Sequence, residues 1–179
     1  AESPGAYSSW TFETFTTSEA YRPEHLDLAI DSSGDPHVAW SSNWGSNDNG
    51  VHYARREAGQ WTVDSVDFDN GAGGDYAHAV ALDLDSAGNA HLSYGVPQYD
   101  QVRYATNEGG SWGISVVDTV PPSSLGFEGV RYTSIGVDPV GGVHIAYQMS
   151  PSNLYYGTNT IRYASGLDCN SNGIHDADD

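Results

Sequence analysis

One ten-residue pattern occurs three times in the sequence, and it constrains the fold more than any other feature. The pattern reads D-x-x-G-x-x-H, followed by two small or apolar residues and an aromatic residue. Its copies begin at Asp31, Asp85 and Asp138, so they are spaced by about 54 residues. A pattern repeated at a fixed spacing predicts a chain built from similar structural units.

Each copy of the pattern predicts a strand, a tight turn and a second strand. Leu26, Leu28 and Ile30 alternate with other residues before the first aspartate, which is the period of a β-strand. The aspartate can accept hydrogen bonds from backbone N–H groups of the turn, and the glycine can adopt a positive φ. The histidine then opens the returning strand, and we interpret the aspartate and the histidine as structural groups.

A tryptophan recurs at Trp10, Trp61 and Trp112, 51 residues apart, and extends the unit to four strands. A repeat of this length with four strands is typical of a β-propeller blade. The chain is therefore predicted to be all-β, with three blades in residues 10–165. The predicted strands are 10–15; 25–31, 36–42, 50–56 and 60–67; 79–85, 90–95, 101–106 and 111–118; 132–138, 143–149 and 160–165.

The D-x-x-G turn followed by an aromatic-bearing strand resembles the Asp-box (BNR-type) repeats of β-propellers, a group that includes sialidases. The resemblance covers roughly residues 10–165. It departs from the sialidase motif S-x-D-x-G-x-x-W, because His37 and its equivalents stand where tryptophan is usual. The resemblance implies a propeller fold and, as an alternative function, a glycan-processing enzyme such as a sialidase-like glycosidase or lyase.

The count of strands predicts self-association. Two predicted blades are complete, the third lacks its fourth strand, and residues 10–15 would supply that strand. Propellers close with about four to eight blades, and unpaired strand edges favour association. The hypothesis is a homo-oligomer in which residues 10–15 of one copy complete the third blade of another. Two copies would then close a six-bladed ring, or the contact would build a filament. The alternative is a piece of a longer propeller.

Aromatic residues occur in the variable loops that connect the second and third strands of each unit. An aromatic ring can stack on the apolar face of a sugar while neighbouring polar groups bind its hydroxyls. Carbohydrate is therefore the predicted ligand, and the alternative is that the rings pack beneath their own loops. The predicted binding residues are Trp44, Tyr99, Tyr155 and Tyr156.

The acidic tail, residues 166–179, reads D-x-N-x-N-G-x-x-D-x-x-D from Asp168. This pattern looks like the calcium loop of EF-hand, dockerin and thrombospondin type-3 motifs, and the resemblance implies Ca²⁺ as a bound ion. The last position is aspartate where glutamate is usual, and the alternative is a disordered acidic tail. The implied ligands are Asp168, Asn170, Asn172, the backbone carbonyl of Ile174, Asp176 and Asp179.

The charge and the motifs of the chain limit the classes of partner, location and activity that it can have. The net charge of −18 makes nucleic acid a poor partner. No apolar run is long enough to predict membrane insertion. Residues 1–9 are interpreted as an N-terminal tail, and the acidic, lysine-free composition favours an extracellular or cell-surface location. Since no catalytic motif can be assigned, the sequence favours a non-catalytic, self-assembling scaffold or binding module over an enzyme.

Overall fold

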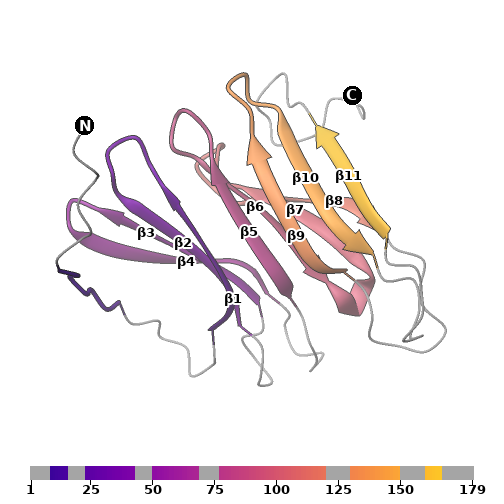
Figure 1. Cartoon of the computed structure of the whole chain (residues 1–179), viewed down its shortest axis with the longest axis horizontal. Helices are drawn as coiled ribbons and strands as arrows, with labels where there is room; N and C mark the ends of the chain where they lie inside the picture. The colour runs from indigo at the N-terminus through magenta and orange to yellow at the C-terminus, as the bar shows by residue number, and fades with distance from the viewer. Residues whose placement is uncertain are drawn as a thin grey trace, which may run out of the picture.

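The computed structural model describes residues 9–15, 23–42, 50–68, 77–119, 130–149 and 160–166. These residues form eleven β-strands in three antiparallel sheets (Figure 1). The one helical element among them is a short 3-10 turn, η1 (Pro97–Tyr99). Among the described residues, no helix has the length and apolar character needed to cross a bilayer.

Each sheet is an up-and-down meander, as the repeat predicts. Strands that are consecutive in the sequence are hydrogen-bonded neighbours in every sheet. Sheet 1 contains β1 (Pro23–Ile30), β2 (Pro36–Ser42), β3 (Gly50–Glu57) and β4 (Gln60–Phe68). Sheet 2 contains β5 (His78–Leu84), β6 (Ala90–Val96), β7 (Gln101–Thr106) and β8 (Gly113–Thr119). Sheet 3 contains β9 (Val130–Val137), β10 (Val143–Met149) and β11 (Thr160–Gly166).

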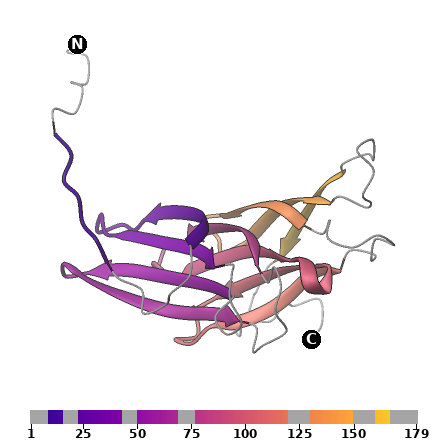
Figure 2. The same ribbon diagram turned by 90° about the horizontal axis from the view of Figure 1, so that it is seen from below.

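The sheets lie next to one another like successive propeller blades, with the first strands β1, β5 and β9 side by side (Figure 1). The three described sheets do not close into a ring (Figures 1 and 2). Residues 9–15, indigo in Figure 2, form no strand, which corrects the prediction of a strand at 10–15. Trp10 is exposed rather than packed between blades.

The first hairpin of each sheet is fixed by its aspartate and glycine. In sheet 2, Asp85 Oδ1 accepts hydrogen bonds from the backbone N–H groups of Ala87 and Asn89, both at 2.8 Å. Gly88 has a φ of 85°, in the left-handed region that glycine tolerates. The turns at Asp31 and Asp138 have the same bonds at the same distances. The predicted turn role of these aspartates is therefore confirmed.

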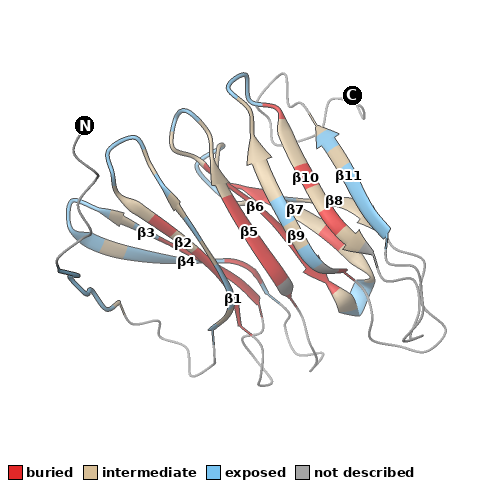
Figure 3. Ribbon diagram, viewed as in Figure 1, coloured by how far each residue is buried: buried red, intermediate tan, exposed pale blue. Residues whose placement is uncertain are grey.

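The hydrophobic core lies between neighbouring sheets, where Figure 3 shows buried residues along β5 and β6. Leu92 and Tyr94 of sheet 2 pack against Tyr53 of sheet 1 in one buried cluster. A second cluster between sheets 2 and 3 is formed by Val102, Val130, Ile145 and Tyr147. Each interface removes apolar side chains from water, which is the main favourable contribution to holding the sheets together.

Two aspartates join the first strands of neighbouring sheets. Asp27 Oδ2 on β1 accepts a hydrogen bond from the backbone N–H of Leu82 on β5 at 2.8 Å. Asp83 Oδ2 on β5 accepts one from the N–H of Val137 on β9 at 2.7 Å. These side chains satisfy backbone donors that face the neighbouring sheet.

Candidate functional site

The most regular polar arrangement is an Asp–His–Tyr relay within each sheet. In sheet 2, His91 Nδ1 lies 2.7 Å from the Tyr104 hydroxyl, and Nε2 lies 3.6 Å from Asp85 Oδ2. His91 is almost completely buried, and this burial lowers the pKa of its imidazole. Burial opposes ionisation of Asp85, but hydrogen bonds from Asn89 and Ala87 outweigh it and lower the pKa of that carboxyl.

The same relay in the other sheets indicates that its role is structural. His37 Nδ1 lies 2.5 Å from the Tyr53 hydroxyl, and His144 Nδ1 lies 2.6 Å from the Tyr163 hydroxyl. Both histidines also approach the aspartate of their own turn. The histidines therefore have a structural role, as predicted, and the partner of each Nδ1 is a tyrosine hydroxyl on the following strand. Among the described residues, no three His, Cys, Asp or Glu side chains come together in a way that could hold a metal ion.

A second polar cluster lies between sheets. Asp67 Oδ2 accepts a hydrogen bond from the Tyr94 hydroxyl at 2.7 Å and pairs with Arg103 Nη1 at 2.9 Å. Asp118, Tyr147 and Arg162 repeat this arrangement between sheets 2 and 3. Burial, together with the hydrogen bond to Asp118, raises the pKa of Tyr147 to about 12. Arg103 and Arg162, which occupy equivalent positions in their repeats, therefore each pair with an aspartate of the preceding sheet.

Beside the first of these clusters, Tyr99 presents its ring to solvent. It ends η1 in the loop between β6 and β7, and the residue is 45% exposed. The guanidinium carbon of Arg103 lies 5.3 Å from the ring centroid, within the range of a cation–π contact. Arg103 Nε also donates to Gln101 Oε1 at 2.9 Å, so the arginine links the ring to Gln101 and Asp67.

Another exposed ring lies at the same end of the sheets. Phe68 ends β4 directly after Asp67, and about half of its surface is exposed. We call Tyr99, Asp100 and Gln101 the Tyr99 surface. The sequence prediction missed Phe68, although a large apolar residue directly after the predicted strand 60–67 was a usable signal. The arrangement offers aromatic surface beside amide and carboxylate groups, and Arg103 balances the charge of Asp67.

Tyr99 is the one predicted site residue that the structure places. It lies in an exposed loop, as predicted, and contacts Arg103. The other predicted residues lie outside the described ranges. These are the aromatic residues Trp44, Tyr155 and Tyr156, and the calcium-loop residues Asp168, Asn170, Asn172, Ile174, Asp176 and Asp179.

Comparison with known proteins shows a shared fold. No family model and no curated protein sequence matches the chain. A protein of unknown function from Dyadobacter fermentans DSM 18053 is similar with a TM-score of 0.56 and 14% identity, over 82% of this chain and 39% of that one. A thermostable family-43 glycoside hydrolase, a β-propeller, is similar with a TM-score of 0.52 and 13% identity, over 87% of this chain and 58% of that one.

A fucose lectin from Kordia zhangzhouensis, solved with methyl-fucoside, has a TM-score of 0.46 and 13% identity, over 79% of this chain and 96% of the lectin. The chain thus spans 39% and 58% of the length of the first two proteins. The three antiparallel sheets of this chain, together with the fold that it shares with the glycoside hydrolase, define its class. The chain is an antiparallel all-β protein with propeller-like blades.

Proposed function

We propose that the chain is a non-catalytic binding module, located outside the cell or on its surface, whose ligand is a carbohydrate bound at the Tyr99 surface. The observation that carries this proposal is the exposed Tyr99 ring, held by Arg103 at a sheet end beside the polar groups of Asp100 and Gln101. The regular core is occupied by hairpin braces and contacts between sheets, which leaves the loop end for recognition.

The chemistry of this surface suits a sugar. An aromatic ring contacts the C–H face of a pyranose, while amide and carboxylate oxygens accept hydrogen bonds from its hydroxyls. The cation–π contact with Arg103 limits the rotamers of Tyr99, so less entropy is lost on binding. A flat or neutral oligosaccharide fits the acidic chain better than a polyanion does, because the net charge is −18.

A glycan array tests the proposal, followed by titration of any sugar that binds. We expect Tyr99→Ala to weaken binding about tenfold, since an aromatic contact is worth roughly 0.5–1.5 kcal/mol beyond its buried area. Tyr99→Phe keeps the ring and should retain most of the affinity. Tyr132→Ala, which removes an exposed ring on β9, is the matched control and should have no effect. Unchanged binding by Tyr99→Ala would contradict the proposal.

The enzyme alternative predicts a different result. A retaining glycosidase needs two carboxylates about 5 Å apart and turns its ligand over. Incubation of the chain with model glycosides and with the sugars found on the array should release no product. Product formation that one carboxylate substitution abolishes would replace the binding module with a glycan-processing enzyme.

The proposed module also binds Ca²⁺ through its tail. Support comes from the sequence pattern that begins at Asp168, whose oxygen-bearing residues alternate as a hard cation requires. Calorimetric titration should show Ca²⁺ uptake by the full chain and none by a chain that ends at Gly166. Asp168→Ala should weaken uptake at least tenfold. Equal uptake by the full and shortened chains would contradict a calcium loop in the tail.

A further inference from the structure

The N-terminal segment, residues 9–15, contacts sheet 1 in the way that the fourth strand of a sheet contacts the next sheet. Glu13 Oε2 accepts a hydrogen bond from the Trp61 indole at 3.2 Å. At the equivalent place between sheets 1 and 2, Asp64 Oδ2 accepts one from the Trp112 indole at 3.4 Å. Glu13 and Asp64 each lie three residues after the tryptophan of their own repeat, so the two contacts are equivalent.

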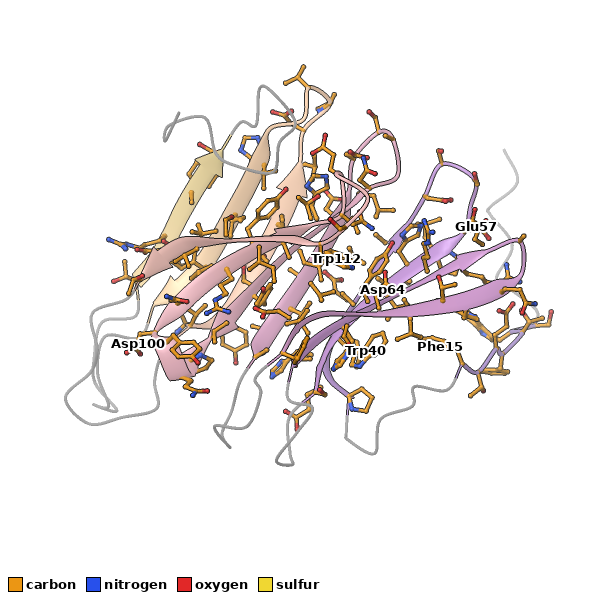
Figure 4. All side chains as sticks on the ribbon, turned by 180° about the vertical axis from the view of Figure 1, so that it is seen from behind. Phe15, Trp40, Glu57, Asp64, Asp100 and Trp112 are labelled. Carbon is orange, nitrogen blue, oxygen red and sulfur yellow. The ribbon has the colours of Figure 1, made fainter. Side chains whose placement is uncertain are left out.

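A second contact supports this equivalence. Phe15 stacks on Trp61 with ring centroids 4.3 Å apart and lies 6.0 Å from the Trp40 ring (Figure 4). The residue that corresponds to Phe15 in β4 is Val66, which lies in the buried cluster that Trp112 packs against. Residues 10–15 therefore occupy the position of the fourth strand of a blade that precedes sheet 1. Among the described residues, no strands lie where the first three strands of that preceding blade would be.

Sheet 3 offers the missing strands. It contains three described strands, and β11 lies at its edge with no neighbour on its outer side among the described residues. Its free face is also open: Tyr163 is 65% exposed, whereas the equivalent Tyr53 in sheet 1 is 1% exposed. Figure 3 shows exposed residues along β11.

Sheet 1 lies at the other end of the row of three sheets and has the complementary apolar face. Leu28 on β1 is 58% exposed, and the equivalent Leu82 on β5, which faces sheet 1, is 6% exposed. Ile30 on β1 is exposed in the same way as Leu28. Sheet 1 thus presents to solvent the same side that sheet 2 buries against sheet 1.

We propose that residues 10–15 of one copy form the fourth strand of sheet 3 in a second copy, and that the exposed face of sheet 1 packs against that same sheet 3. The contact repeats the internal interfaces between sheets 1 and 2 and between sheets 2 and 3. The occupant is a second copy because sheets 1 and 3 of one chain lie on opposite sides of sheet 2 (Figure 1). The inference does not depend on the Tyr99 surface and survives if that site fails.

The repeat predicts the register of the new strand pair. Tyr53 lies opposite Asp64 in sheet 1, and the equivalent Tyr104 lies opposite Ser115 in sheet 2. Tyr163 should therefore lie opposite Glu13 of the second copy. In the same register, Ser165 lies opposite Thr11, and Arg162 lies opposite Thr14.

Disulfide cross-linking tests both the partner and the register. All variants carry Cys169→Ser, so that no native thiol remains. Chains with Thr11→Cys alone and with Ser165→Cys alone are mixed and oxidised, and we expect a covalent dimer that joins the two variants. The control mixture replaces Thr11→Cys with Thr14→Cys, which lies about 10 Å further along the strand. It should cross-link at least about ten times more slowly.

The alternative outcomes overturn the proposal. Equal or absent cross-linking in the two mixtures would contradict the predicted register and partner. A chain that carries both Thr11→Cys and Ser165→Cys and closes only on itself, at monomer mass, would show that the second copy is not the occupant.

A solution measurement with surface variants tests the apolar face independently. Sedimentation of the full chain at 100 µM should show dimers or larger assemblies, and Leu28→Asp should shift at least 90% of the material to monomer. Leu28 is exposed in the single chain, so the variant should still fold. Val140→Asp is the control. The residue equivalent to Val140 in sheet 2 is Ala87, which stays exposed although sheet 2 has a sheet on each side. The Val140→Asp variant should therefore assemble normally. A monomeric parent chain, or assembly unaffected by Leu28→Asp, would refute the interface.

Discussion

Removal of the Asp85 carboxylate should destabilise the central sheet more than its partly exposed position suggests. The carboxylate accepts two backbone N–H bonds at 2.8 Å, from Ala87 and Asn89, and a third from the Asn89 side chain at 2.7 Å. Hydrogen bonds to charged groups contribute roughly 1.5–3 kcal/mol each. Because water can replace part of this bonding at the turn, we expect Asp85→Ala to lower the free energy of unfolding by about 2–4 kcal/mol.

Urea unfolding followed by tryptophan fluorescence measures this loss, and Asp85→Asn separates the hydrogen bonds from the charge. The asparagine oxygen still accepts the two backbone bonds, so this variant should lose only about 1 kcal/mol. A loss below about 1 kcal/mol for Asp85→Ala would refute the reasoning. Equal losses for the two variants would show that charge, rather than the hydrogen bonds of the turn, stabilises the hairpin.

The lowered pKa of Asp85 adds a dependence on pH. The unfolded chain binds a proton at this carboxyl more readily than the folded chain, so the stabilisation is present above the unfolded pKa of about 3.9. It is lost as pH falls through the lower folded pKa. The difference in stability between the parent chain and Asp85→Asn should therefore shrink as the pH approaches 3.

Three further predictions concern packing and titration. Leu82→Ala should cost about 2–5 kcal/mol in urea unfolding because the side chain is buried between sheets, whereas Leu28→Ala should cost under about 0.5 kcal/mol in the unassembled chain. Gly95→Ala should lower the melting temperature, since a Cβ there would lie 2.7 Å from the Val130 carbonyl oxygen on the next sheet. Burial lowers the pKa of His91, so the unfolded state binds more protons below about pH 6.5, and stability should rise with pH up to that value; His91→Gln should flatten this rise in pH-dependent unfolding.

The strands and turns were predictable because their determinants are local. Around Asp85, apolar alternation marks the flanking strands, and the aspartate and Gly88 form the turn within four residues. No distant contact is needed to recognise such a hairpin, and the structure places β5 and β6 where the sequence predicted them.

The prediction at residues 10–15 shows the limit of local signals. Trp10 and its neighbours have the same pattern as the first half of β4, yet they form no strand in this chain. A β-strand requires hydrogen-bond partners from another backbone, and the pattern of one segment does not record whether that partner is present.

The contacts of Asp27 and Asp83 with the next sheet were not predictable from the repeat pattern. Asp27 lies four residues before the turn aspartate of its unit, whereas Asp83 lies two residues before its own. Alignment of the repeats does not bring them together, although both bind the backbone of the next sheet. In the candidate site, the exposed Tyr99 ring was predictable from its loop, but its contact with Arg103 depends on tertiary packing.

The Asp–His–Tyr relay has a consequence for how such chains evolve. Each relay closes within a single sheet, so a duplicated gene segment of about fifty codons would carry a complete brace with it. The same segment encodes the acid that lies three residues after each tryptophan, and this acid accepts a hydrogen bond from the tryptophan of the next repeat. A copy of the segment therefore brings its own hairpin brace and its own tryptophan contact, which makes the number of sheets easier to change in evolution than the structure of any one sheet.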